Sequence, residues 1–185
     1  MDSSVYKIIK EKDGMKFART AKNHYQTHFS MQNSFIHLPS IINFDLLKLL
    51  YDLSSDIYEK VHLEKINEKE AVVCLLMKHF FQDMGLPQRY YYFHVEMTET
   101  DSMIRFYSQS IHADRPEWIP SDAHLVPMQS MTFLCEIVSP HKVNVLSSVV
   151  FQENQVIPPF MEKFVGMIIH KIFNRLKQFI ENYRN

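Results

Sequence analysis

Residues 155–179, QVIPPFMEKFVGMIIHKIFNRLKQF, decide the fold that the sequence predicts. Pro158 and Pro159 stand near the start of this stretch. Proline suits the first turn of a helix, because its missing N–H would have no partner there. Long side chains follow the two prolines, so the stretch predicts a long C-terminal helix that begins at the double proline.

One apolar stripe runs along this predicted helix at 100° per residue, which predicts contact with a sheet. The stripe consists of Met161, Val165, Ile168, Ile169, Ile172, Phe173, Leu176, Phe179, Ile180 and Tyr183. Phe160, Phe164 and Met167 lie outside the stripe, on a second face. In the later turns this second face carries polar residues such as Lys171 and Arg175. The first two turns are therefore apolar nearly all round, and we expect an apolar element other than the sheet to cover them.

Alternating apolar and polar residues in the middle of the chain predict antiparallel strands with one buried face and one solvent-exposed face. The expected covered positions are Tyr91, Phe93, Val95 and Met97, then Met131, Phe133, Cys135 and Ile137, and then Val143, Val145, Val149 and Phe151. Polar turn residues at 98–102 (TETDS) and 139–141 (SPH) predict two hairpins. Two shorter apolar runs joined by residues 67–70 (NEKE) precede them.

The first part of the chain mixes helix and strand signals. The residues before Asp13-Gly14 predict a short amphipathic helix, and Met15–Thr20 predict a strand after this turn. A second strand is expected at about residues 28–38. Asn43 is placed to cap a helix with leucines at helical spacing. The whole pattern predicts a single α+β domain over residues 1–185, without repeats or linkers.

Composition excludes several classes of function. The 20 basic and 21 acidic residues give a net charge of −1, so nothing favours binding to nucleic acid over the whole surface. Three glycines are too few for a phosphate-binding loop or a dinucleotide fingerprint. The sequence has no run of about 18 apolar residues and no secretory signal pattern. We expect a protein of the cytoplasm or an organelle interior, peripheral to membranes and not secreted.

Cysteine, histidine and serine patterns predict neither a metal site nor a catalytic site. The two cysteines lie in apolar runs and are expected to be buried free thiols. His24 and His28 have a zinc-like spacing for a helix, but no third ligand is nearby. Ser108, Ser110 and His112 share a parity, but no nucleophile motif surrounds them, so a polar lining or a solvated face is expected. We therefore expect no cofactor and no enzymatic activity.

Arg89 opens a predicted strand on the same parity as Tyr91, so its guanidinium is placed to point inward. A buried arginine needs an anionic partner. The candidates are Glu96, another carboxylate or the headgroup of a ligand. The alternative is an arginine at the rim that stays in water.

The order of the elements resembles START domains, the steroidogenic-acute-regulatory-related lipid-transfer family. Four stretches carry the resemblance: residues 6–20 (YKIIKEKDGMKFART), 85–97 (GLPQRYYYFHVEM), 106–117 (FYSQSIHADRPE) and 144–168 (NVLSSVVFQENQVIPPFMEKFVGMI). The chain departs from the family pattern at residues 51–61 (YDLSSDIYEKV), where an arginine and a tryptophan-aspartate pair are usual. It also departs at Tyr90, where an aspartate usually follows the arginine.

The resemblance implies a helix-grip fold, in which a curved antiparallel sheet wraps around the long C-terminal helix and further helices follow the first strands. It implies one lipid or sterol ligand between sheet and helix. The residues expected to contact that ligand are Arg89, Tyr91, Phe93, Val95, Phe106, Phe133, Phe151, Phe164, Ile168 and Ile172.

The resemblance also implies a lid, formed by the loop at residues 80–88 and the start of the last helix. Its expected residues are Phe80, Phe81, Met84, Leu86, Phe160 and Met167. We expect the second apolar face of the helix to pack on this loop, and an open lid to meet a membrane surface transiently. The alternative is a START-like domain whose cavity is filled by side chains and which serves a larger protein assembly.

Overall fold

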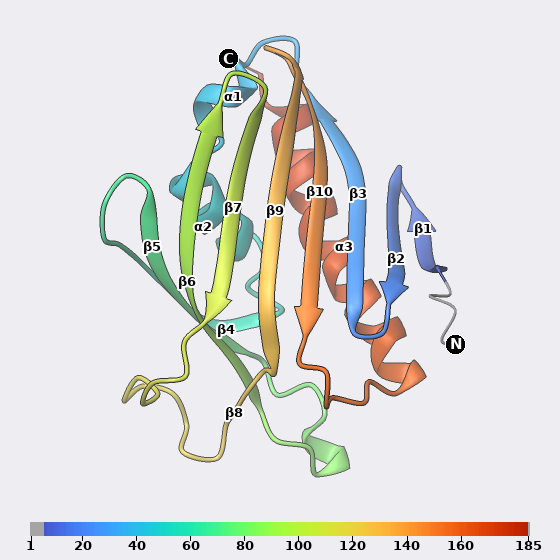
Figure 1. The fold of residues 1–185 in the computed structure, drawn as a ribbon, viewed down its shortest axis with the longest axis vertical. Helices are drawn as coiled ribbons and strands as arrows, with labels where there is room; N and C mark the ends of the chain where they lie inside the picture. Colours follow the sequence, from blue (N-terminus) through green and yellow to red (C-terminus); the bar gives the residue numbers. More distant parts are fainter. Residues whose placement is uncertain (1–5, 185) are drawn as a thin grey trace.

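The computed structural model describes residues 6–184 and shows a ten-stranded curved sheet with a long helix, α3, behind it (Figure 1). The strands are β1 (Lys7–Lys12), β2 (Met15–Ala21), β3 (His24–Gln32), β4 (Tyr58–Lys65), β5 (Glu70–Met77), β6 (Arg89–Thr100), β7 (Met103–Ser110), β8 (His124–Leu125), β9 (Met128–Ser139) and β10 (Lys142–Phe151). The helices are α1 (Leu38–Ile41), α2 (Phe44–Asp52), the short 3-10 turn η1 (Gln82–Met84) and α3 (Pro159–Asn182).

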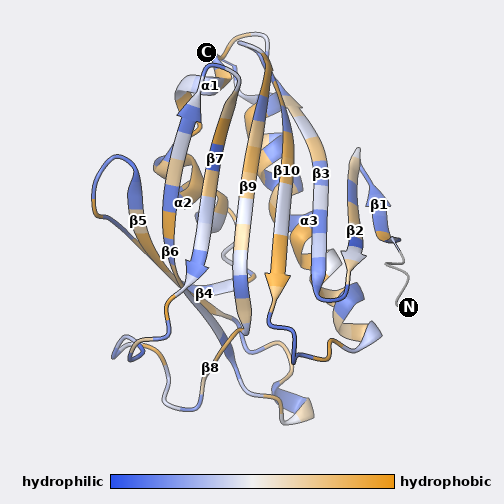
Figure 2. Cartoon of the chain, in the orientation of Figure 1, coloured by the Kyte–Doolittle hydropathy of each residue, from blue (hydrophilic) through white to orange (hydrophobic). Residues whose placement is uncertain are grey.

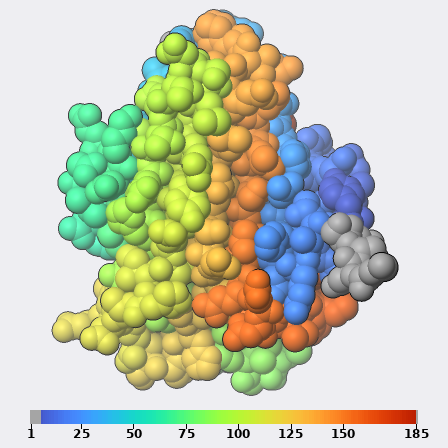
Figure 3. Space-filling view, in the orientation of Figure 1, coloured from blue at the N-terminus to red at the C-terminus, as the bar shows by residue number. Residues whose placement is uncertain are grey.

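The strand order is β1-β2-β3-β10-β9-β7-β6-β5-β4, and each neighbouring pair is antiparallel. The two-residue β8 pairs in parallel with the start of β6. The third strand, β3, pairs with the last strand, β10, so the N-terminal strands β1–β3 join the sheet beside its C-terminal strand. In the space-filling view the strands hide most of α3 (Figure 3). This is the predicted α+β helix-grip architecture.

The predicted inner faces of the central strands are confirmed. Hydropathy alternates along the strands (Figure 2), and the residues expected inside are buried or half-buried. The capped helix is also confirmed as α2. The Asn43 side chain accepts hydrogen bonds from the backbone N–H groups of Asp45 (2.9 Å) and Leu46 (3.2 Å).

The prediction of a helix before Asp13 is wrong, because these residues form β1. Asp13 (φ 54°) and Gly14 (φ 73°) both have positive φ, the geometry of a tight turn that joins two antiparallel strands. The register with β2 shifts between Ile8 and Lys10. Because of this irregularity, β1 lacks the strict alternation of apolar and polar residues that marks a strand. The adjacent residues Ile8 and Ile9 therefore favoured the prediction of an amphipathic helix.

The second strand was predicted too late in the chain. β3 ends at Gln32, and Asn33 then leaves the sheet to bind the end of α3. Its Nδ2 donates to the carbonyl oxygens of Ile180 (2.6 Å) and Tyr183 (2.8 Å), and its Oδ1 accepts from the N–H of Phe35 (2.7 Å). Asn33 therefore satisfies carbonyl groups that the end of a helix leaves without partners.

The apolar stripe of α3 packs as predicted except at its end. Ile168, Ile172, Phe173, Leu176 and Ile180 are buried. Phe179 and Tyr183 are exposed instead, and their rings contact each other at 6.4 Å. Tyr183 lies beyond the last helical residue and has an extended backbone, so it no longer follows the phase of the stripe.

The outer face of β5 and β6 is partly covered. The expectation that this face is exposed to solvent along the whole sheet is therefore wrong here. Ile119 and Ala123, from the segment between β7 and β8, pack with Cys74, Leu76 and Tyr90 on this side. The two cysteines are buried and free, Cys74 in this outer cluster and Cys135 in the main core. No helix within residues 6–184 is long and apolar enough to cross a membrane.

Candidate functional site

The residues expected to contact a ligand all belong to elements that enclose one space, between the sheet and α3. Those on the sheet come from β6, β7, β9 and β10, and the others from the first half and the middle of α3. Alternation turns the strand residues toward the helix, and all except Arg89 belong to the main hydrophobic core or pack against it. The structure thus brings them together around a common interior.

Aromatic side chains fill this interior beside the second half of α3. Phe173 contacts Phe29 (ring centroids 5.1 Å apart) and Phe133 (5.7 Å). Phe133 contacts Phe106 (6.3 Å), which contacts Phe44 of α2 (5.6 Å). All five rings are buried. Phe106 and Phe133, both expected to contact a ligand, are therefore packed into the core.

Half-buried side chains stand beside the first half of α3. Several inward-facing side chains here remain half-buried although they pack against the core. They are Tyr91, Met131, Val149, Phe151, Phe164 and Ile169. Because these side chains keep accessible surface, the interior is not fully closed here, and we call this part the unsealed end.

The loop between β5 and β6 lies against the start of α3. Rings of Phe80 and Phe81 contact Phe164 at 5.3 Å and 4.6 Å, and Phe81 also contacts Phe160 at 6.5 Å. This contact covers part of the second apolar face of the helix. Phe80, Met84, Phe160 and Met167 nevertheless keep 40% to 62% of their surface exposed. An apolar fringe thus surrounds the unsealed end.

A buried carboxylate anchors the start of α3, and the sequence analysis missed it. Glu162 is 3% exposed and accepts hydrogen bonds from Arg19 Nη1 (2.7 Å) and the Tyr25 hydroxyl (2.9 Å). Lys7 Nζ lies 3.7 Å from its other oxygen. Burial and the neighbouring carboxylate raise the pKa of Tyr25 far above its usual value. The sequence feature that could have revealed this buried carboxylate is an acidic residue in the otherwise apolar first turn of α3.

Arg89 lies on the inner side of β6 and is half-buried, in agreement with the interpretation that it points inward. Glu96 is not its partner, because Glu96 is exposed and has the opposite parity on the strand. The Arg89 side chain makes no ion pair or hydrogen bond with another residue in the described range 6–184. Its charge nevertheless acts on the Tyr91 hydroxyl, whose rise in pKa it opposes.

The histidine and serine patterns do not form a site. His24 and His28 are exposed on β3, where a spacing of four residues separates them by about 13 Å. Within residues 6–184 no three His, Cys, Asp or Glu side chains gather as metal ligands. Ser110 donates to the carbonyl of Met128 (2.5 Å), and the strand ends there, so His112 does not share its face as predicted.

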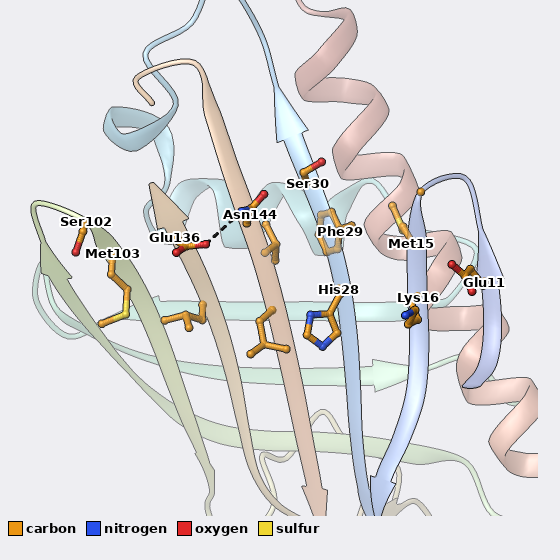
Figure 4. A pocket seen from close by; sticks show the side chains of 14 residues that line it. Glu11, Met15, Lys16, His28, Phe29, Ser30, Ser102, Met103, Glu136 and Asn144 are labelled. Atoms are coloured by element: carbon orange, nitrogen blue, oxygen red, sulfur yellow. Dashed lines mark hydrogen bonds between the residues drawn. The ribbon is translucent and has the colours of Figure 1, made fainter. Parts of the chain in front are cut away.

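A shallow groove of about 800 Å³ crosses the opposite, outer face of the sheet (Figure 4). Polar side chains such as Lys16, His28 and Ser30 line it, and Asn144 donates to Glu136 at 3.2 Å across its floor. The groove is separated from the interior by the sheet itself. Its lining is mixed, because Met103, Leu134 and Leu146 also border it.

Neither a protein-family model nor a curated protein sequence matches the chain. Solved structures do. The lipid transfer and protein localization domain of human StarD13 (DLC2) matches with a TM-score of 0.70 and 9% identity, over 98% of this chain and 91% of that one. Human StAR-related lipid transfer protein 5 matches with a TM-score of 0.66 and 12% identity, over 97% and 88%.

A bacterial protein extends the comparison. The STAR-related lipid transfer protein from Xanthomonas axonopodis matches with a TM-score of 0.60 and 13% identity, over 95% of this chain and 98% of that one. Similarity over nearly the full length of each chain, at such low identity, establishes the fold and not the ligand. The chain has the helix-grip fold of START domains.

Proposed function

We propose that this chain is a non-catalytic lipid-binding protein that holds one hydrophobic ligand between the sheet and the first half of α3. The observation that supports the proposal is a group of half-buried apolar side chains beside the first half of α3. Phe80 and Phe81 contact Phe164 next to this group. Apolar interiors with few polar groups are typical of lipid sites. The whole chain would act as one binding unit.

The loop at residues 80–88 and the start of α3 would act as the lid. Separating them uncovers Phe80, Phe81 and Phe164, next to Met84 and Phe160, which are already exposed. Exposing such a surface to water is unfavourable, and a membrane interface is the natural acceptor for it. Ligand exchange would therefore take place during transient contact with a membrane.

Lipid extraction and mass spectrometry test the binding step. Protein purified without detergent should carry one class of lipid at near one-to-one stoichiometry. Protein that is empty, and that also takes up no lipid from liposomes, would contradict the proposal.

Transfer of a lipid between liposomes tests the lid. Met84→Asp places a charge in the exposed fringe, and Phe164→Asp places one at the contact under the loop. Each should slow transfer by at least about tenfold, because a carboxylate opposes insertion into the interface. Val138→Asp is the matched control, since Val138 is 52% exposed but lies on the outer face of β9. Transfer at the wild-type rate in both lid variants would refute the role of the lid.

The second candidate function is a structural subunit of a larger assembly. The aromatic packing around Phe133 and Phe173 favours it, because these buried rings occupy the interior beside the second half of α3. The extraction experiment separates the two candidates: an empty protein that cannot be loaded, but co-purifies with fixed partner chains, supports the structural role.

A further inference from the structure

Three tyrosines from different elements lie near one another on the inner side of the sheet. Tyr51 lies in the last turn of α2, and its ring meets that of Tyr58, the first residue of β4, edge to face at 5.6 Å. Tyr58 pairs with Met77 of β5, and Tyr91 of β6 pairs with Leu75 of the same strand. Tyr58 and Tyr91 thus flank β5 on the inner side of the sheet.

The three phenol groups are close enough to influence one another. Burial raises the pKa of Tyr51 and Tyr58 above the usual value, and the neighbouring Tyr91 adds to both increases. Burial raises the pKa of Tyr91 to about 12. All three groups therefore stay protonated at neutral pH and are available as hydrogen-bond donors.

None of the three hydroxyls donates to or accepts from another side chain or backbone group in residues 6–184. Each phenol oxygen keeps some accessible surface, since the fully buried side-chain polar atom without a hydrogen bond in that range is His170 Nε2, which lies 3.2 Å from Asp13 Oδ2. The phenol oxygens therefore face space that an oxygen atom from outside the chain can enter. Buried polar groups normally have partners, so three free donors at one place indicate a polar group supplied by something else.

Arg89 brings a positive charge to the same place. It precedes Tyr91 by two residues on the inner side of β6, and its guanidinium opposes the rise in the pKa of Tyr91. The acidic residues nearby in the sequence are engaged elsewhere. Glu59 accepts from Gln88 (2.8 Å), and Asp56 is paired with cations of α3. The cluster thus offers N–H and O–H donors with a net positive charge.

We propose that Arg89, Tyr51, Tyr58 and Tyr91 bind the anionic headgroup of the ligand, a carboxylate or a phosphate, with its apolar chain directed along α3. This inference rests on the proposed lipid-binding function. A guanidinium and phenol donors match the acceptor oxygens of such a group. Three aromatic rings could instead surround a quaternary ammonium, but the Arg89 charge opposes a cation in the same space.

Equilibrium binding of four ligands with the same chain length tests the headgroup preference. The probes are hexadecanoate, hexadecan-1-ol, palmitoyl lysophosphatidate and palmitoyl lysophosphatidylcholine, each titrated below its critical micelle concentration into delipidated protein. We expect hexadecanoate and lysophosphatidate to bind about tenfold or more tightly than the alcohol. The ratio between the two anions tells whether a carboxylate or a phosphate fits better.

Variants then assign the preference to the cluster. Arg89→Gln should weaken hexadecanoate binding about tenfold or more and leave the alcohol unchanged, while Arg89→Lys should restore part of the loss. Tyr91→Phe should weaken the anions a few-fold. Arg105→Gln is the control, because Arg105 lies on the outer face over the Tyr107 ring and should change neither ligand. Melting temperatures show that each variant is folded.

The outcomes separate this inference from the proposed function. Equal binding of acid and alcohol by the wild-type chain would overturn the anionic preference and leave lipid binding intact. Tightest binding of lysophosphatidylcholine would show an aromatic cage for a cation and also overturn it. Binding of none of the four would overturn both.

Discussion

Replacing Gly166 by alanine should destabilise the protein, although alanine is the better helix former. A Cβ at Gly166 would lie 2.8 Å from Cδ1 and 3.1 Å from Cε1 of Phe17, and 3.5 Å from Cγ2 of Ile9. Carbon atoms in contact normally stay about 3.5–4.0 Å apart, so the Phe17 ring would have to move. Phe17 is 3% exposed and stacks on Tyr25 at 5.7 Å, which leaves it little room.

Two opposing effects set the magnitude. Alanine gains about 0.5–1 kcal/mol over glycine inside a helix. Overpacking a buried contact costs about 1–3 kcal/mol. We therefore expect Gly166→Ala to lower the free energy of unfolding by about 1 kcal/mol, measured by urea denaturation.

The same substitution in a Phe17→Val background is the matched control. Valine has no δ or ε atoms, so the clash is absent and Gly166→Ala should there raise stability by about 0.5–1 kcal/mol, the helix-propensity gain alone. Opposite signs in the two backgrounds identify the ring contact as the cause. A stabilising effect in the wild-type chain, or equal effects in both, would refute the argument that this close approach limits residue 166 to glycine.

Two further predictions concern polar contacts of α3. Asn33→Ala should lower the free energy of unfolding by about 1–3 kcal/mol, because the carbonyl group of the buried Ile180 loses its donor. Asn33→Asp, which keeps only the acceptor, should cost as much in the same denaturation assay. Arg175, and then Lys171, hold the pKa of Asp56 well below its usual range. The ion pairs of Asp56 therefore contribute stability above about pH 4, and this contribution is lost as the pH falls further. Asp56→Asn should remove this loss, so the free energy of unfolding should change less between about pH 4 and pH 2. An unchanged profile would contradict the second prediction.

Local periodicity explains which parts of the fold the sequence predicts. The phase of α3 and the alternation of β6, β9 and β10 depend on neighbouring residues, and the structure confirms them. β1 depends on a partner strand instead. Its isoleucines look helical until the turn at Asp13-Gly14 and the register shift beside Ile8 are known. An edge strand is decided by pairing, which local patterns do not contain.

The polar residues of the site escaped prediction for a related reason. Glu162 is buried because Arg19 and Tyr25 reach it from β2 and β3, far away in sequence. Tyr51 and Tyr58 stand in the stretch that departs from the START pattern, and nothing local shows that β6 brings Tyr91 beside them. A convergent cluster becomes visible only when the topology places its three elements together.

The start of α3 is fixed by polar contacts to the sheet. Glu162 joins it to Arg19 and Tyr25, and Asn23 holds the segment before it by donating to the carbonyl oxygens of Gln152 (2.8 Å) and Gln155 (2.9 Å). Moving the helix away would break charge-assisted hydrogen bonds worth about 1.5–3 kcal/mol each. These contacts lie on the β1–β3 side, opposite the loop at residues 80–88.

That loop is held differently, because its hydrogen bonds are largely its own. His79 Nε2 bonds to the carbonyl of Leu86 (2.6 Å), and the N–H of Leu86 donates to the carbonyl of Phe81 (3.2 Å). The rings of Phe80 and Phe81 contact α3. Swinging the loop outward separates apolar surfaces, which a membrane can replace, and breaks no buried ion pair. Opening therefore costs least when the loop moves and α3 stays. Because β5 leads directly from Met77 beside Tyr58 into the loop, this entrance would lie over the tyrosine cluster.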